Sequence, residues 1–174
     1  MTKAKTSTWQ NAPLDAETRV TSDHHQSLRV WLRMLACTNL IGTHVRQKLQ
    51  AQFGITLPRF DLMAQLERAP QGLKMGELTR RLMVTGGNVT GITDMLEAEG
   101  LVERTTDPAD QRAFRVKLTK AGQQQFQRMA AEHERWVVDL FDDLTVKQKT
   151  LLAELLTALK RSATERLLAA GGPR

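Results

Sequence analysis

The chain has 174 residues, of which 41% are hydrophobic and 25% are charged. This composition is typical of a globular protein and excludes an intrinsically disordered chain, and no uncharged apolar run is long enough for a membrane-spanning helix. The single cysteine, Cys37, excludes an internal disulfide framework and a multi-cysteine metal site. The N-terminal sequence lacks the apolar segment of a secretory signal, so we expect a cytoplasmic protein with no membrane association.

The formal net charge is +6, and the surplus lies near the N-terminus. Residues 1–60 contain eight basic and three acidic side chains, whereas residues 72–120 contain eight and seven, as do residues 121–174. A basic chain favours nucleic acid as a partner. Because the middle of the chain is nearly neutral, an argument for DNA binding must rest on where individual basic residues lie.

The first fifty residues contain two different segments. Residues 1–22 are polar and show no sustained period, so we expect a flexible N-terminal arm. Residues 23–53 carry apolar side chains at spacings of three and four, which predicts one long helix. A helix of about thirty residues is about 45 Å long, and a lobe of this size cannot cover it alone. The length therefore suggests a partner subunit.

The next elements are shorter. Gly54 ends the long helix and Leu57-Pro58 begins another, because proline at the first helical turn loses no needed hydrogen-bond donor. A short strand is expected at residues 73–75 and a helix at residues 77–83. The buried face of the helix that begins at Leu57 is predicted to consist of Phe60, Leu62, Met63 and Leu66.

A further helix is predicted from Thr85, a plausible N-cap, to about Glu99, and it turns Val89, Ile92 and Leu96 inward. Strands are expected at residues 101–106 and 113–118, joined by a hairpin loop at 107–111 that is rich in turn residues. A helix from Thr119 to about Leu140 follows. Thr145 and Gln148 form a capping box for a last, leucine-rich helix.

The run from Gly54 to Gly122 resembles the winged helix-turn-helix core of the MarR family of bacterial transcription regulators. The similarity lies in the helix pair GELTRRLMVTGGNVTGITDMLE, the turn EAEGLVER and the wing DPADQRAFRVKLTKAG. The long flanking helices fit the family's dimerisation lobe by length and position. The segment GGNVTG also resembles a subgroup of regulators of aromatic-acid catabolism.

The resemblance implies a mainly α fold with a small β-hairpin wing, in which long N- and C-terminal helices form a dimerisation lobe. The expected organisation is a flexible arm at 1–22, a dimerisation helix at 23–53, a winged helix-turn-helix DNA-binding domain at 54–120 and C-terminal dimerisation helices at 121–170.

A helix-turn-helix places its second helix, here residues 85–99, in the major groove. Asn88 can pair with an adenine edge, and Thr90 can offer a hydroxyl to a base or a methyl group to thymine. Gly86 and Gly87 allow close approach of the backbone to a phosphate, or alternatively to the preceding helix. No Lys or Arg occurs between Met83 and Glu103, unlike in many family members. We therefore expect A·T contacts and DNA shape to matter more than guanine recognition.

Basic residues instead flank this helix on both sides. In the family, the wing tip enters the minor groove through an arginine held by an aspartate two residues earlier, and these correspond to Arg112 and Asp110. The alternative is a surface ion pair without function. The predicted DNA-binding residues are Arg80, Thr85, Gly86, Gly87, Asn88, Thr90, Gly91, Thr93, Arg104, Asp110, Arg112 and Arg115.

The resemblance also implies a small-molecule effector bound between the dimerisation and DNA-binding lobes. We expect an aromatic carboxylic acid or its thioester, because an arginine at position 59 can clamp a carboxylate. The alternative for the apolar candidates is that they belong to the core. The candidate ligand-binding residues are Ser27, Trp31, Thr38, Arg59, Phe60 and Met63.

The predicted function is a homodimeric, sequence-specific regulator of transcription, a repressor that the effector releases from a palindromic double-stranded DNA operator. One alternative is an architectural or protein-interaction winged-helix protein without effector control. Another is an oxidation sensor that uses Cys37. We do not expect an enzyme, because no P-loop, HExxH or G-x-S-x-G motif occurs, and we expect neither a metal site nor a cofactor.

Overall fold

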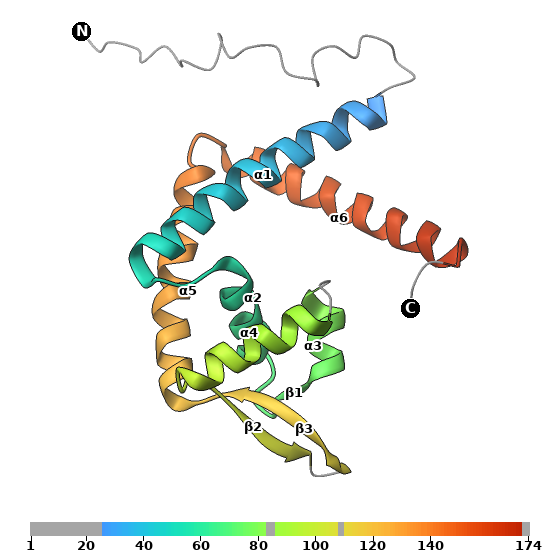
Figure 1. The fold of residues 1–174 in the computed structure, drawn as a ribbon. Coiled ribbons are helices and arrows are strands. Elements are labelled where there is room, and N and C mark those ends of the chain that lie inside the picture. Colours follow the sequence, from blue (N-terminus) through green and yellow to red (C-terminus); the bar gives the residue numbers. More distant parts are fainter. Residues whose placement is uncertain (1–25, 83–85, 108–109, 172–174) are drawn as a thin grey trace, which may run out of the picture.

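The computed structural model describes residues 26–82, 86–107 and 110–171. The helices and strands follow the predicted order (Figure 1). They are α1 (Gln26–Phe53), α2 (Leu57–Glu67), β1 (Leu73–Lys74), α3 (Met75–Leu82), α4 (Gly86–Ala98), β2 (Val102–Asp107), β3 (Asp110–Leu118), α5 (Lys120–Leu140) and α6 (Val146–Ala169).

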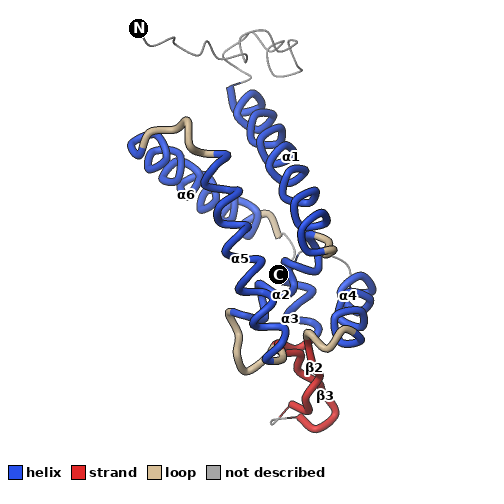
Figure 2. The backbone as a smooth tube through the Cα atoms, turned by 90° about the vertical axis from the view of Figure 1, so that its left-hand side faces the viewer, coloured by secondary structure: helices blue, strands red, loops and turns tan. Residues whose placement is uncertain are grey.

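The elements form two lobes that α5 connects (Figures 1 and 2). The lower lobe contains α2, α3 and α4 with the β-hairpin projecting from it, and the beginning of α5 packs against it. The upper lobe contains α1, the end of α5 and α6, which stands away from the rest of the chain. The lower lobe is therefore compact, whereas the upper lobe consists of long, extended helices.

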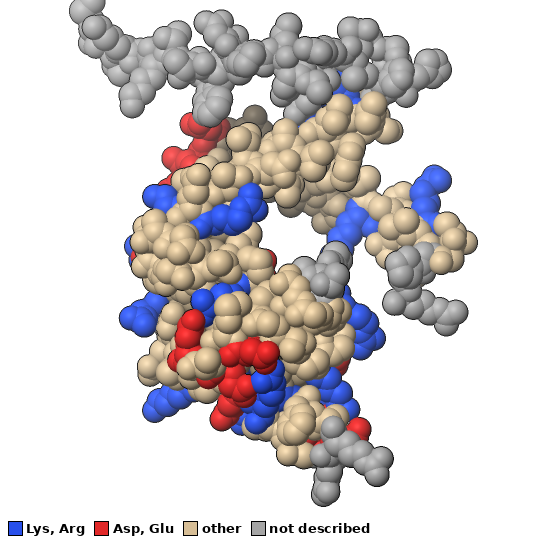
Figure 3. Space-filling view, viewed as in Figure 1, with Lys and Arg blue, Asp and Glu red and all other residues tan. Residues whose placement is uncertain are grey.

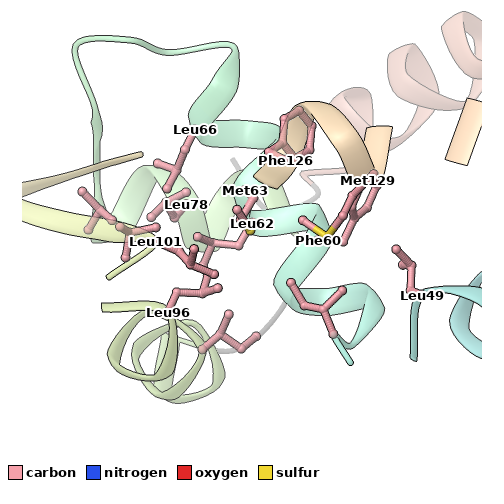
Figure 4. Close-up of a cluster of buried hydrophobic side chains, with 14 of the residues drawn as sticks. Leu49, Phe60, Leu62, Met63, Leu66, Leu78, Leu96, Leu101, Phe126 and Met129 are labelled. Atoms are coloured by element: carbon pink, nitrogen blue, oxygen red, sulfur yellow. The ribbon is translucent and has the colours of Figure 1, made fainter. Parts of the chain in front are cut away.

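The hydrophobic core lies where α2, α3 and α4 meet the sheet and α5 (Figure 4). Leu62, Leu78 and Leu96 are fully buried there, and each buried leucine stabilises the fold by about 1.5–3 kcal/mol. The structure confirms the predicted inner faces of both helices. On α2 these are Phe60, Leu62, Met63 and Leu66, and on α4 they are Val89, Ile92 and Leu96.

The three strands form an antiparallel sheet in the order β1-β3-β2. β2 and β3 pair from Val102 opposite Leu118 to Thr106 opposite Phe114, and the register then shifts so that Asp107 lies opposite Asp110. The predicted hairpin loop at 107–111 is too long, because the backbone ladder extends to Asp107 opposite Asp110, both of which lie inside the predicted loop. The β-hairpin is therefore longer than the sequence indicated, and β1 fastens it to the start of α3.

Two helices of the upper lobe leave apolar side chains uncovered. None of the 24 residues of α6 is buried, and of the 28 residues of α1 only Val45 and Leu49 are. The N-terminal half of α1 exposes Leu28, Trp31 and Leu35. α6 begins with the predicted capping box between Thr145 and Gln148. Its exposed leucines are Leu151, Leu152, Leu155, Leu156, Leu159, Leu167 and Leu168.

Across the part of the chain that the structure describes, no helix is both long and apolar enough to cross a membrane.

Candidate nucleic-acid interface

The outer face of α4 presents small residues. Gly87 and Gly91 are exposed, one turn apart, and a Cβ added to either would meet no atom within 4 Å. A Cβ on Gly86 would lie 3.9 Å from Oγ1 of Thr79, which is ordinary contact. Close packing against α3 therefore does not explain Gly87 or Gly91, and the middle of the outer face can lie very close to another molecule.

Polar and apolar side chains border these glycines. Asn88, Thr90 and Asp94 are exposed, as is half of Met95. The Thr90 hydroxyl donates to the carbonyl oxygen of Gly86 at 3.1 Å, so its methyl group and the lone pairs of its oxygen remain for a ligand. Thr85 lies outside the described residues.

The prediction that Thr93 faces DNA is wrong. Its side chain is fully buried, and its hydroxyl donates to the carbonyl oxygen of Val89 at 2.8 Å. This bond satisfies the hydroxyl inside the helix, so threonine can occupy a core position. Thr93 also completes the inner stripe with Ile92 and Leu96, at the spacings of one helix face.

Arg104 on β2 lies against α4, and two acidic residues of that helix bind it. Its guanidinium donates to Asp94 and to Glu97, and its backbone N–H donates to Oε1 of Glu97 at 3.2 Å. The hydrogen bond to Asp94 raises the pKa of Arg104; partial burial opposes this, and the charges of Glu97 and Asp94 add to it. Figure 3 shows acidic and basic side chains together in this region. Arg104 therefore joins the first strand of the hairpin to the second half of α4, with both acidic residues of the helix bound to one arginine.

A second cluster joins the wing to the residues before α3. The Asp107 side chain is fully buried, and its Oδ2 accepts from Nε of Arg115 at 2.8 Å and pairs with Nζ of Lys74 at 3.0 Å. Arg115 also donates to the carbonyl oxygen of Gly72 at 3.1 Å. The predicted DNA contact Arg115 therefore has partners inside the protein, and the sequence analysis missed Asp107, which it placed in the hairpin loop.

The remaining predicted contacts lie on α3 and on the wing. Arg80 is exposed in the last turn of α3, next to Arg81, and its Nε donates to the carbonyl oxygen of Gly76 at 3.4 Å. Asp110 is exposed at the start of β3. The backbone of Arg112 belongs to β3, whereas its side chain lies outside the described residues. The structure thus places α3, α4 and the wing side by side (Figure 1).

The six candidate ligand-binding residues do not form one pocket in the single chain. Ser27, Trp31 and Thr38 are exposed on the outer part of α1. Phe60 and Met63 belong to the hydrophobic core, so the alternative interpretation describes these two correctly. The sixth candidate, Arg59, is mostly buried on α2.

Arg59 forms an ion pair with Glu99, just beyond the end of α4. Its Nε is buried and has no hydrogen-bond partner among the described residues. The ring of Phe60 lies 5.1 Å from His133 and 5.4 Å from Phe126, both on α5. Burial raises the pKa of the adjacent Asp61, and the charge of His133 opposes this. The start of α2 therefore contacts both the end of α4 and α5, the helix that joins the lobes.

The described residues contain no group of three or more histidine, cysteine or acidic side chains that could hold a metal ion. Cys37 is exposed on α1. A groove of about 290 Å³ lies between the end of α5 and α6, away from the six candidates. Val137, Phe141 and Leu152 are among its lining residues.

Comparison with known proteins shows similarity along most of the chain. A model of the MarR family matches residues 53–113. A MarR family transcriptional regulator from Silicibacter pomeroyi is 32% identical, with a TM-score of 0.70, and the match covers 82% of this chain and 99% of that one. The chain belongs to the MarR family. This confirms the family and the winged-helix fold that the sequence predicted.

Two further relatives show how the MarR protein compares within its family. Sco3205, a MarR family transcriptional regulator from Streptomyces coelicolor whose structure contains DNA, is 26% identical over 82% of this chain and 90% of that one, with a TM-score of 0.69. The transcriptional activatory protein BadR from Rhodopseudomonas palustris is 26% identical over 76% of this chain and 79% of its own length. This MarR protein is a DNA-binding transcriptional regulator and not an enzyme.

Proposed function

We propose that the protein acts as a homodimer that binds a palindromic DNA operator and represses transcription until a small aromatic carboxylic acid or its thioester releases it. The observation that carries this proposal is the outer face of α4, where Gly87 and Gly91 are exposed and Asp94 pairs with Arg104 of β2 in the wing. Such a surface fits the major groove, with the wing directed at the adjacent minor groove.

The dimer is supported by the apolar surface that α1 and α6 leave uncovered. Two-fold dimers pair the same surface of both subunits, and their interfaces are rich in apolar side chains. Trp31 is 56% exposed and Leu155 is 59% exposed, and such side chains gather on these two helices rather than being scattered singly. A second copy that packs there would also place two copies of α4 on one operator.

The operator is proposed to depend on A·T pairs beneath α4. Asn88 is exposed and suits the N6 and N7 atoms of adenine, whereas α4 contains no Lys or Arg for a guanine. The nearest arginine, Arg104, is held by Asp94 and Glu97. Arg80 of α3 and Arg112 of the wing are proposed to bind the flanking phosphates and the minor groove.

Effector release is proposed to act through Arg59. Its guanidinium holds the carboxylate of Glu99, next to α4. An aromatic acid that offered its own carboxylate to Arg59 would compete with Glu99 and so free the end of the helix. Ser27, Trp31 and Thr38 are proposed to complete this site in the dimer, where α1 of either subunit can contribute.

The name of BadR describes an activator, so the sign of regulation is proposed separately from DNA binding. Repression is expected if the operator overlaps a promoter. Expression of a reporter gene, measured with and without the protein, distinguishes repression from activation. Increased reporter expression on adding the protein would contradict repression while leaving the operator proposal in place.

Selection of bound DNA from a random pool, repeated with aromatic acids and their thioesters, tests the proposal. We expect a palindrome with A·T pairs in each half-site, bound about a thousandfold or more tightly than random DNA and released by one of the acids. Arg59→Ala removes the partner of Glu99, so it should mimic the effector and bind the operator weakly with or without the acid. Arg68→Ala, an exposed control on the same segment, should bind and respond like the wild type. Binding without sequence preference would instead support the architectural alternative.

A further inference from the structure

Asp107 is a buried acidic residue at the outer end of β2, although its neighbour Thr106 and Asp110 on the opposite strand are exposed. Only 1% of the residue is accessible to solvent. A carboxylate in such a place is costly unless it is paired, and here Lys74 and Arg115 both bind Oδ2. Their own side chains remain 40% and 29% exposed, so the two cations keep part of their hydration while the anion has lost its own.

The cluster joins all three strands of the sheet. Lys74 belongs to β1 and is followed directly by α3, whereas Arg115 belongs to β3. Arg115 also binds the carbonyl oxygen of Gly72. The approach is tight, because a Cβ on Gly72 would lie 2.8 Å from the carbonyl oxygen of Val116, and Gly72 adopts a φ of +79°. Asp107 therefore fastens the end of the wing to the residues from which α3 begins.

The shift in strand register explains how Asp107 reaches this place. The β2–β3 ladder is regular up to Thr106 opposite Phe114 and then shifts between Thr106 and Asp107. Such an irregularity redirects a side chain relative to its neighbours along the strand. The exposed ion pair between Lys117 and Glu103, 3.2 Å apart nearer the base of the hairpin, spans only β2 and β3. It therefore lacks a link to α3.

We propose that Asp107 is a positioning residue that fixes the wing relative to α3 and α4, and so sets where the wing meets DNA relative to the bases beneath α4. This inference rests on the proposed function, in which α4 occupies the major groove and the wing the adjacent minor groove. A hairpin that is held only at its base can move relative to α4, so binding to DNA would cost conformational entropy. A hairpin that is also held near its tip is already fixed and avoids this cost. Lys74 and Arg115 then act by holding the wing.

Asp107→Asn in the full chain tests this proposal, because the amide keeps the shape but removes the charge that holds both cations. The matched control is Glu103→Gln, which breaks the exposed ion pair on the same strand. Both variants are compared with the wild type on the DNA selected by the wild type, and on versions in which one A·T pair is changed to G·C. One change lies at the centre of a half-site and the other at its edge, under the wing.

In the wild type and in Glu103→Gln, each change should weaken binding about fivefold or more. In Asp107→Asn, the central change should keep its full effect, whereas the edge change should have none. Hydroxyl-radical footprinting should show the same loss of minor-groove protection at the edges only. A lower unfolding temperature alone would not produce this selective loss, which separates positioning from stability.

The proposal is overturned if Asp107→Asn keeps the edge preference of the wild type, or if it loses central and edge preferences equally. If this variant does not fold, Lys74→Met removes one of the two cations at a more exposed position, and a smaller loss confined to the edge is expected. An unchanged edge preference in Lys74→Met then overturns the proposal. If the wild type selects no specific DNA, the proposed function itself fails, which is a different result from failure of the wing effect.

Discussion

Arg104 in the first wing strand forms an ion pair with Asp94 on the outer half of α4. Asp94 is 56% exposed and Arg104 is 28% exposed, so the pair lies at the surface that faces DNA in our proposal. Glu97 binds the same guanidinium, which leaves two carboxylates for one cation. A net negative charge near phosphates weakens binding, so in our proposal this part of α4 limits DNA affinity.

We expect Asp94→Asn to raise DNA affinity. The substitution removes one negative charge and leaves Arg104 paired with Glu97 alone, and titrations at about 50 mM salt should show a gain of about threefold that shrinks at higher salt. Asp142→Asn, an exposed site between α5 and α6, is the matched control and should change little. Weaker binding by Asp94→Asn would mean that Asp94 is needed to hold Arg104 in place.

Leu155→Glu should convert the proposed dimer into a monomer without unfolding the chain. Leu155 is 59% exposed in the single chain, so its replacement leaves no cavity in the core, whereas a dimer interface would bury the charge. Sedimentation measures the change in mass, and circular dichroism checks the helices. The control is Thr157→Glu, on the opposite side of α6. If both variants sediment like the wild type, this face of α6 does not form the interface.

The sequence predicted the parts of the fold that depend on local patterns. Spacing alone identified Val89, Ile92 and Leu96 as the inner face of α4, and the pair Thr145 and Gln148 identified the start of α6. These features are visible because helix periodicity and capping involve residues within one or two turns.

The errors concern residues whose roles depend on distant partners. Thr93 was assigned to the outer face because its side chain is polar, but its hydroxyl is satisfied by Val89 inside the helix. Asp107 was assigned to a turn because Asp-Pro favours turns. Its burial depends on the pairing of β1 with β3, in which Lys74 lies opposite Arg115, 41 residues further along the chain. A carboxylate flanked in the folded sheet by two cations leaves no local pattern in the sequence.

Met95 provides a test of the proposed A·T preference. It is 50% exposed and lies seven residues after Asn88, so both side chains occupy the same side of α4. A thymine methyl group is the apolar feature of the major groove that such a side chain can cover. Replacing one operator thymine by uracil should weaken wild-type binding about fourfold, the value for one buried methyl group. Met95→Ala should not distinguish the two bases, and equal sensitivity would exclude the contact.

Asp61 should make folding stability depend on pH. Burial raises its pKa above the usual 3.8, so the folded protein holds a proton that the unfolded chain releases more readily. Stability from this group is therefore highest below pH 3.8 and falls as the pH rises through the folded-state pKa. Asp61→Asn should be more stable than the wild type at neutral pH, and the two should converge in acid. Urea unfolding at several pH values measures the free energy of unfolding of both proteins. A variant less stable than the wild type at neutral pH would show that the attraction between the Asp61 carboxylate and His133 outweighs the cost of burying the charge.

Substitutions at Gly87 and Gly91 should have opposite effects on folding stability and on DNA binding. Both lie within α4, where glycine costs about 0.5–1 kcal/mol relative to alanine, and neither has an atom within 4 Å of an added Cβ. Gly87→Ala and Gly91→Ala should therefore each increase the free energy of unfolding by about that amount.

The same two variants should bind the selected operator more weakly, because the added methyl group stands where α4 approaches DNA most closely. Gly76→Ala is the control, since it also has open space and lies within a helix, but on α3. Thermal unfolding measures the stability of each of the three variants, and DNA titration independently measures its affinity for the operator. Greater stability with unchanged operator affinity would mean that α4 does not enter the groove at Gly87 and Gly91. Greater stability with weaker binding would show that these glycines serve DNA binding at the expense of the helix.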